Sequence, residues 1–237
     1  MSNQHWKRPS TIAFPSIWHS FKASDPYDGQ PTTYRIQDLP PNRWDDAIDH
    51  MCEYFLRDEP ICASLQLADD PVAVRELRAI WSKVVEQKCA VVCFKEDSEE
   101  IIALNMLNVV SKEFQEPIVL KSPTARVFVN STLHMTAKGD LFNRYGVDHY
   151  LSAWGLSVHP KFRGLGLATE VIRTRIPLAK TFGLALSATV FSHPGSQIPA
   201  AKVGFQDEVV ESFADLAKEG FPIEVNVEFN KLMTLKI

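Results

Sequence analysis

The segment Arg163-Gly-Leu-Gly-Leu-Ala168 is the clearest candidate for ligand binding in this 237-residue chain. Gly164 and Gly166 allow the backbone to turn tightly and to approach a ligand without an intervening Cβ. An apolar run precedes the segment and helical spacing follows it, so it joins the end of a strand to the start of a helix. Amides at a helix N-terminus bind anions, and Arg163 adds a positive charge. The pattern predicts a loop that binds a diphosphate.

Two other glycine-rich phosphate loops do not fit these residues. The P-loop needs Lys followed by Ser or Thr after its last glycine, and neither follows Gly164 or Gly166 at that place. The dinucleotide fingerprint GxGxxG has Thr169 at its third glycine, and no acidic residue closes the next apolar run, 184–191. A glycine-rich turn without a ligand stays open as the alternative.

The spacing Arg-x-x-Gly-x-Ala in this loop resembles the coenzyme A pyrophosphate loop of the GNAT superfamily of acyl-CoA N-acyltransferases, and Gly204-Phe205 resembles the Gly-Phe pair before a later strand of that family. The resemblance covers residues 33–235. It implies an α/β GNAT fold with a central mixed β-sheet flanked by helices, acetyl-CoA as cosubstrate and no metal. The cofactor-binding residues that it implies are Leu156, Ser157, Val158, Arg163, Gly164, Leu165, Gly166, Leu167 and Ala168. A backbone amide near Val158 would stabilise the oxyanion.

Within this superfamily, Phe55-Leu-Arg-Asp-Glu-Pro60 looks like the F-x-x-D-E-P signature of insect-type arylalkylamine (dopamine-like) N-acetyltransferases. That resemblance implies that Glu59 acts as general base. The chemistry is coherent, because a protonated amine must lose a proton before it can attack a thioester. A solvated helix end followed by a proline stop is the alternative for Asp58-Glu59-Pro60.

Ser192 and Ser196 reproduce two serines, four residues apart, that the same subfamily carries. The resemblance implies that Ser196 protonates the departing thiolate or orients water and that Ser192 lines the acyl-CoA cleft; which serine is the general acid stays open. Helix N-capping is the alternative for either. Pro194-Gly195 departs from the bulkier residues of relatives, and the last tyrosine is Tyr150, so the late tyrosine acid of many GNAT enzymes has no counterpart.

The resemblance therefore implies acetyl-CoA-dependent N-acetylation of a small primary amine, an arylalkylamine in the first instance, by direct transfer in a ternary complex. Polyamines, hydrazine-like amines or protein N-termini are alternative substrates, and a non-catalytic acyl-CoA sensor is the alternative of another class. An acyl-cysteine at Cys62 is disfavoured because no cysteine has a basic partner at a recognisable motif spacing. The histidines form no HxxxH or HExxH pair, which argues against a metal.

Composition restricts the partners further. The chain has 25 Lys and Arg against 29 Asp and Glu, a net charge of −4, whereas nucleic-acid and membrane-surface binders need a basic surface. No run approaches the roughly 20 apolar residues of a membrane span, and the first residues lack the apolar core of a secretory signal. A cytoplasmic location is the expectation. The sequence leaves the oligomeric state open.

Apolar periodicity predicts the elements that position these residues. Residues 1–32 are predicted to be an irregular arm that packs on the domain, covers a site or is partly disordered, and residues 33–237 are predicted to form the catalytic domain. Pro177 is expected to kink the helix that follows the loop. Strands are predicted at 34–39, 89–94, 101–110, 150–158, 184–191, 205–210 and around 225–230, and helices at 44–55, 72–86, 124–145, 166–182 and a short stretch ending at 203.

Overall fold

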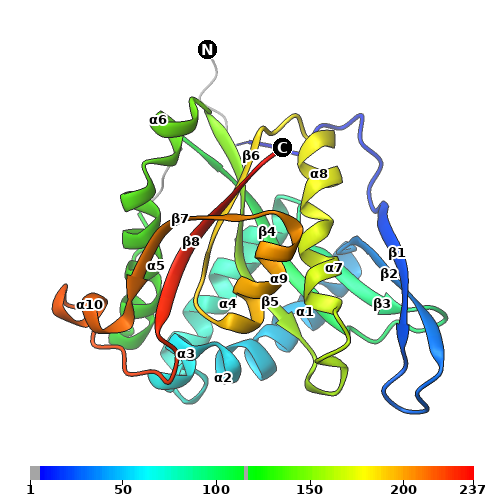
Figure 1. Cartoon of the computed structure of the whole chain (residues 1–237), viewed down its shortest axis with the longest axis horizontal. Helices are drawn as coiled ribbons and strands as arrows, with labels where there is room; N and C mark the ends of the chain where they lie inside the picture. Colours follow the sequence, from blue (N-terminus) through cyan, green and yellow to red (C-terminus); the bar gives the residue numbers. More distant parts are fainter. Residues whose placement is uncertain (1–5, 115–116) are drawn as a thin grey trace.

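In the computed structural model, which describes residues 6–114 and 117–237, one eight-stranded sheet runs through the chain (Figure 1). Its order is β1-β2-β3-β4-β5-β6-β8-β7, and neighbouring strands are antiparallel except β5 and β6. The predicted mixed α/β sheet is therefore confirmed. The strands are β1 Ile17–Ser24, β2 Pro31–Asp38, β3 Val91–Lys95, β4 Ala103–Ser111, β5 His149–Val158, β6 Leu186–Phe191, β7 Gln206–Ser212 and β8 Phe229–Lys236.

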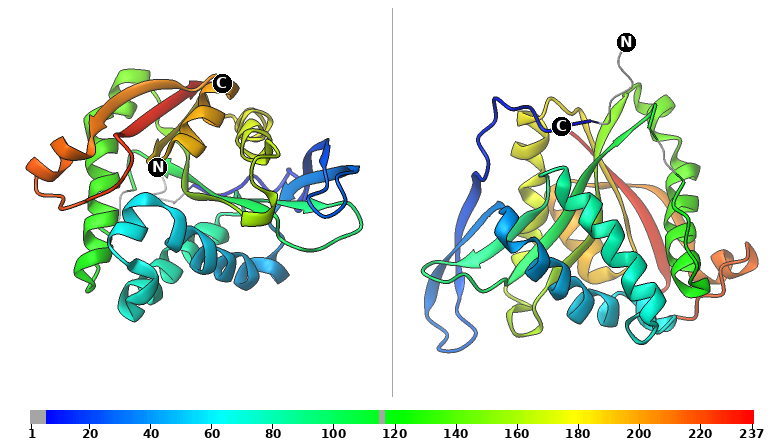
Figure 2. Two further views of the ribbon diagram at one scale, coloured as in Figure 1. Left: turned by 60° about the horizontal axis from the view of Figure 1, so that its bottom comes forward. Right: turned by 180° about the vertical axis from the view of Figure 1, so that it is seen from behind.

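Helices cover both faces of this sheet. The helices α1 to α5 and α10 pack through one apolar cluster on one face, and α7 and α8 pack through a second cluster on the other, with α9 beside them (Figure 2). They are α1 Trp44–His50, a π-helical turn Met51–Phe55, α2 Leu56–Asp58, α3 Pro60–Ser64, α4 Pro71–Glu86, α5 Pro123–Gly139, α6 Leu141–Tyr145, α7 Leu167–Arg173, α8 Arg175–Thr181, α9 Pro194–Val203 and α10 Phe213–Lys218. No helix in these two ranges is long and apolar enough to cross a membrane.

The two longest helices begin where local sequence signals place them. At α4, the Asp70 carboxylate accepts hydrogen bonds from the Val72 and Ala73 amides, and proline occupies the first helical position. At α5, the Ser122 hydroxyl accepts from the Ala125 amide in the same way. Side-chain caps satisfy N–H groups that have no partner inside the helix, so these boundaries follow from adjacent residues.

The strands β5 and β6 separate beyond a single parallel pair, Leu151 opposite Ser187. Strand β5 stays paired with β4 as far as Val158, after an irregularity in register between Asn105 and Leu107. At this place Gly155 has a φ of 122°, and a Cβ there would lie 2.5 Å from the Met51 Cε. Glycine thus allows the helical layer to approach the strand where the sheet opens.

Residues 6–32 of the predicted arm are more ordered than predicted, and residues 1–5 lie outside the described residues. Ile17–Ser24 forms the edge strand β1, which pairs antiparallel with β2, so the prediction of an irregular arm is wrong for these residues. The arm also packs on the domain, because the Arg8 guanidinium and the Trp18 indole N–H both bind the Asp38 carboxylate. Local periodicity did not reveal β1 because none of its residues is fully buried, so this edge strand lacks the buried apolar face that produces an alternating pattern.

The helix predicted over 166–182 is divided at Thr174. This division is expected from Pro177, which has no N–H to donate to the carbonyl of Arg173. The last strand, by contrast, is β8 at 229–236 rather than 225–230. Val225 and Val227 pack against the α1–α5 core without belonging to a strand, so their alternation came from burial alone. Helix α10 was not predicted.

Candidate active site

A cleft of about 590 Å³ lies where β5 and β6 separate. Most of its lining residues come from four segments: the turn between α2 and α3, strand β5, the glycine loop with the start of α7, and the end of β6 with α9. Phe128 and Thr132 on α5 and Arg175 on α8 also line it. The structure places nearly all the predicted site residues on its wall. These are Glu59, Leu156, Ser157, Val158, Arg163, Gly164, Gly166, Leu167, Ala168, Ser192 and Ser196; Leu165 packs against the α7–α8 core instead.

The glycine loop has the backbone conformation that glycine favours. Gly164 and Gly166 have φ values of 79° and 81°, and Gly166 is the N-cap of α7. A Cβ at either position would meet no atom within 4 Å, so glycine is needed here for the left-handed backbone rather than for space. The loop and the first turn of α7 both face the cleft.

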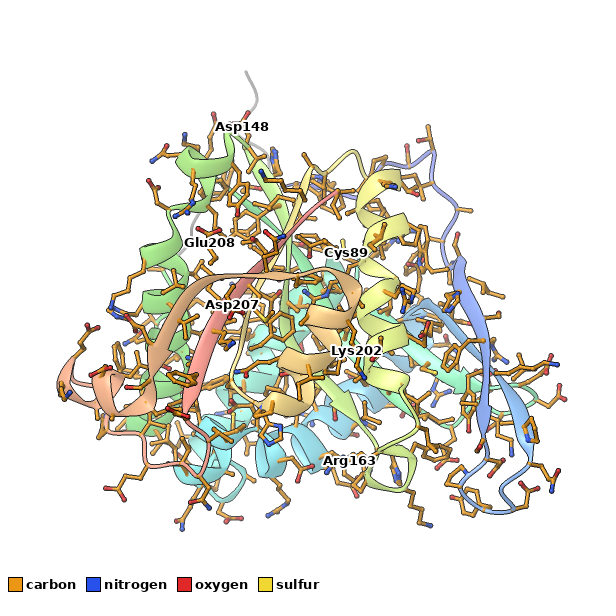
Figure 3. The ribbon with its side chains drawn as sticks, viewed as in Figure 1. Cys89, Asp148, Arg163, Lys202, Asp207 and Glu208 are labelled. Atoms are coloured by element: carbon orange, nitrogen blue, oxygen red, sulfur yellow. The ribbon has the colours of Figure 1, made fainter. Side chains whose placement is uncertain are left out.

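Arg163 connects the glycine loop to the segment around Glu59. Its guanidinium forms an ion pair with Asp58 and donates through Nε to the Val158 carbonyl at 3.0 Å. Lys202 on α9 is a second cation in the cleft wall, and Figure 3 shows both side chains. Lys202 was not predicted from the sequence. A cation six residues after Ser196 was the only available signal, and it does not by itself distinguish a binding residue from a solvated one.

Glu59 lies at the junction between α2 and α3 and caps α3. Its backbone leaves the helical region, with φ −67° and ψ 127°, and its Oε2 accepts from the Cys62 amide at 2.7 Å. Its Oε1 accepts a hydrogen bond from the Ser192 hydroxyl at the end of β6. Glu59 thus ends one helix, as the alternative interpretation expected, and at the same time presents an oriented carboxylate to the cleft.

The two serines have different partners. Ser192 binds Glu59, whereas the Ser196 hydroxyl donates to the His193 carbonyl at 2.9 Å within α9. The N-cap of α9 is His193, whose Nδ1 accepts from the Gly195 amide at 2.9 Å. The N-cap alternative is therefore wrong for both serines.

A buried histidine contacts one of the predicted cleft residues. His50 on α1 is 6% exposed, and its Nε2 lies 3.1 Å from the Ser157 hydroxyl. Burial, together with the nearby side chains of His159 and Arg163, lowers the pKa of His50 to about 4. The ring is therefore neutral at neutral pH. No sequence pattern indicates this contact, because His50 stands at an ordinary helical position.

Two other groups of potential ligands or nucleophiles lie apart from the cleft wall. Cys62 is fully buried, and burial raises the pKa of its thiol well above the usual value. His134, Glu211 and Glu219 could offer ligand atoms within 4.8 Å of one another, a cluster that the sequence did not predict. The Lys138 ammonium already forms ion pairs with both carboxylates there.

Comparison with known proteins identifies the fold and the family. No protein-family model and no curated protein matches the chain. Among solved structures, an insect protein designated arylalkylamine N-acetyltransferase 7, from the yellow fever mosquito Aedes aegypti, is 40% identical, with a TM-score of 0.95 over 98% of this chain and 99% of its own.

More distant structures share the fold. Arylalkylamine N-acetyltransferase 2 from Aedes aegypti is 21% identical with a TM-score of 0.76, over 86% of this chain and 99% of its own. A Drosophila melanogaster polyamine N-acetyltransferase is 14% identical with a TM-score of 0.72, over 86% and 100%. The 40% identity over nearly both full chains shows more than fold. This chain belongs to the insect arylalkylamine N-acetyltransferase family of the GNAT superfamily, and it is an acyltransferase.

Proposed function

We propose that this enzyme transfers the acetyl group of acetyl-CoA to a small primary amine of the arylalkylamine class, by direct transfer in a ternary complex. The observation that carries this proposal is the hydrogen bond from Ser192 to Glu59 inside a cleft whose wall also includes the glycine loop. The name of the 40% identical mosquito protein supports the same activity.

The residues of the cleft fit a long cosubstrate with one anionic end. Arg163 and Lys202 supply positive charge beside the amides of the Gly166 helix start, which suits a diphosphate. Directly after β5, the His159 amide donates to the carbonyl of Ile102, the residue before β4. Successive amides of an extended strand alternate in direction, so the Val158 amide points toward the opened side. That N–H is suited to bind a developing oxyanion.

The other part of the cleft suits an aromatic amine. Phe55 and Phe128 line it with Trp154, close in the fold to the Glu59 junction. Trp44 and Trp81 are not among the lining residues and pack in the core instead. Aromatic and apolar walls favour a substrate with an aryl group.

The charges of the cleft favour an arylalkylamine over a polyamine. Among the described lining residues, Asp58 and Glu59 are the acidic ones, and Asp58 is already paired with Arg163. One unpaired carboxylate matches one ammonium group. A polyamine carries at least two positive charges and would leave the second without a partner.

The proposed chemistry uses Glu59 as the proton acceptor. The carboxylate takes a proton from the ammonium, and the free amine nitrogen then forms a bond to the acetyl carbonyl carbon as the carbon–sulfur bond breaks. The nitrogen loses its second proton as the amide forms, and the thiolate that leaves takes up one proton. Ser192, Ser196 or water in the cleft is available to pass this proton from the nitrogen to the sulfur. Cys62 is excluded as an acyl carrier by its burial and raised pKa, which supports direct transfer.

A thiol-release assay with acetyl-CoA tests the proposal across arylalkylamines, polyamines, hydrazines and peptides with free N-termini. We expect the highest kcat/KM with arylalkylamines. A clear preference for a polyamine or a peptide would contradict the proposed arylalkylamine substrate, while the acyltransferase activity itself would still hold. Calorimetric binding of acetyl-CoA without turnover of any amine would favour the sensor alternative.

A further inference from the structure

Arg175, the first residue of α8, is a fully buried cation in the wall of the cleft. Its Nε donates to the Asn105 Oδ1 at 3.0 Å, and its Nη1 donates to the Thr189 hydroxyl at 2.7 Å. Its Nη2 has no hydrogen-bond partner, and none of the ion pairs in the described part of the chain includes Arg175.

The two partners of Arg175 lie on β6, one of the two strands that separate, and on β4, the strand beside β5. Thr189 lies on β6, two residues beyond Ser187, which forms the only parallel pair between β5 and β6. Asn105 lies on β4, and its amide donates to the Gly155 carbonyl on β5 at 2.7 Å. The guanidinium therefore connects β6 to β5, through Asn105, close to the point where the cleft begins.

An unpaired guanidinium in such a place is unusual, because buried charges are normally paired with a carboxylate. Here the charge faces neutral acceptors and the rings of Phe191 and Phe205, whose centroids lie 5.6 Å from Cζ. Burial lowers the pKa of Arg175 to about 9, so it stays protonated at neutral pH. A buried donor without an acceptor destabilises the fold, and an oxygen acceptor on a ligand would offset that cost.

We propose that Arg175 is a positioning residue for the acyl-CoA substrate, and that its Nη2 donates to a carbonyl oxygen in the pantetheine–thioester part of that molecule. The proposal rests on the proposed function, which puts acyl-CoA in this cleft. Asn105 and Thr189 hold Nε and Nη1, which leaves Nη2 as the donor of the guanidinium without a partner. The phosphates would lie at the glycine loop, leaving the pantetheine and thioester carbonyls as the acceptors within reach of the strands.

Calorimetry with two probes tests this contact separately from catalysis. One probe is acetyl-CoA, and the other is adenosine 3′,5′-bisphosphate, which has the nucleotide end without the pantetheine arm. We expect Arg175→Met and Arg175→Lys to weaken acetyl-CoA binding by about 10- to 100-fold, the range for a hydrogen bond to a charged group, and to leave binding of the bisphosphate unchanged. Lys202→Met is the control for the nucleotide end and should weaken both probes.

Other outcomes overturn the proposal in distinct ways. If the Arg175 variants bind both probes more weakly and to the same extent, Arg175 only supports the fold. If they bind acetyl-CoA with unchanged affinity, Arg175 makes no contact with acetyl-CoA. If Arg175→Met does not fold, Thr189→Val tests the proposal instead, because this variant keeps the Arg175 charge and removes the hydrogen bond from Arg175 to Thr189. We expect Thr189→Val to bind acetyl-CoA more weakly and to bind the bisphosphate with unchanged affinity. Absence of acetyl-CoA binding by the unaltered enzyme would instead contradict the proposed function.

Discussion

The hydroxyl of Ser192 donates a hydrogen bond to Oε1 of Glu59, although 133 positions separate the two residues in the chain. The bond joins the end of β6 to the junction between α2 and α3, across the opening of the sheet. Because the Cys62 amide binds the other carboxylate oxygen, Glu59 is held from two sides. In the role proposed for Glu59, a proton acceptor fixed in this way needs little reorganisation when substrate arrives.

Replacing Glu59 by glutamine should remove the proton acceptor and preserve the cap of α3, because the amide oxygen can still accept from the Cys62 amide. We expect kcat to fall by about 10²- to 10⁴-fold and acetyl-CoA affinity to stay unchanged. Steady-state kinetics and calorimetry measure the two effects. Glu53→Gln, an exposed change a few residues earlier, is the matched control. Full turnover by the Glu59 variant would exclude Glu59 as general base.

The two serines should differ in their effect on turnover. Ser192→Ala removes the bond that orients Glu59, whereas Ser196→Ala removes a hydroxyl that binds a carbonyl of its own helix. We therefore expect the larger fall in kcat from Ser192→Ala, with the pH dependence of kcat changed in that variant alone. A larger effect from Ser196→Ala would reverse this expected order and assign the general acid to Ser196.

The ion pair between Asp58 and Arg163 should compete with the binding of an anionic cosubstrate. Both side chains are nearly half exposed, and such pairs contribute about 0.2–1 kcal/mol. Asp58→Asn should therefore raise acetyl-CoA affinity by up to about fivefold, with the gain reduced at high salt. Asp69→Asn, which removes the surface partner of Arg57, is the control. Weaker binding in Asp58→Asn would mean that Asp58 holds Arg163 in its binding orientation.

His50 should make the folded state sensitive to acid. Its pKa is about 4 in the fold and about 6.5 in an unfolded chain, so the unfolded state binds more protons between these values. The stabilisation by the neutral ring is thus complete above pH 6.5 and is lost as the pH falls toward 4. At pH 5 the loss is roughly 2 kcal/mol. Urea unfolding at pH 7.5 and at pH 5 measures this loss of unfolding free energy. In His50→Gln, the part of the loss that comes from His50 should be absent.

The outcome for His50→Gln is specific to this histidine. The half-buried residue His149 offers a comparison, because His149→Gln leaves the contact between His50 and Ser157 and the buried His50 ring in place. An identical acid response in His50→Gln and the unaltered protein would show that other groups cause the loss of stability.

The sequence by itself determined the features that depend on adjacent residues. The glycine loop, the helix starts at Asp70 and Ser122 and the division of the helix at Pro177 all follow from side chains or backbone constraints within a few positions. The loop and the F-x-x-D-E-P motif were enough to indicate the family, because each is a contiguous pattern.

Only the tertiary structure decided which of these residues meet. The contact of Ser192 with Glu59 and the bond of Arg175 to Asn105, across 70 positions, depend on strand order and register, which local periodicity does not encode. The same holds for β1, whose hydrogen bonds come from β2. The residue types thus limited the possible chemistry, and the separation of β5 from β6 provided the space in which those residues face one another.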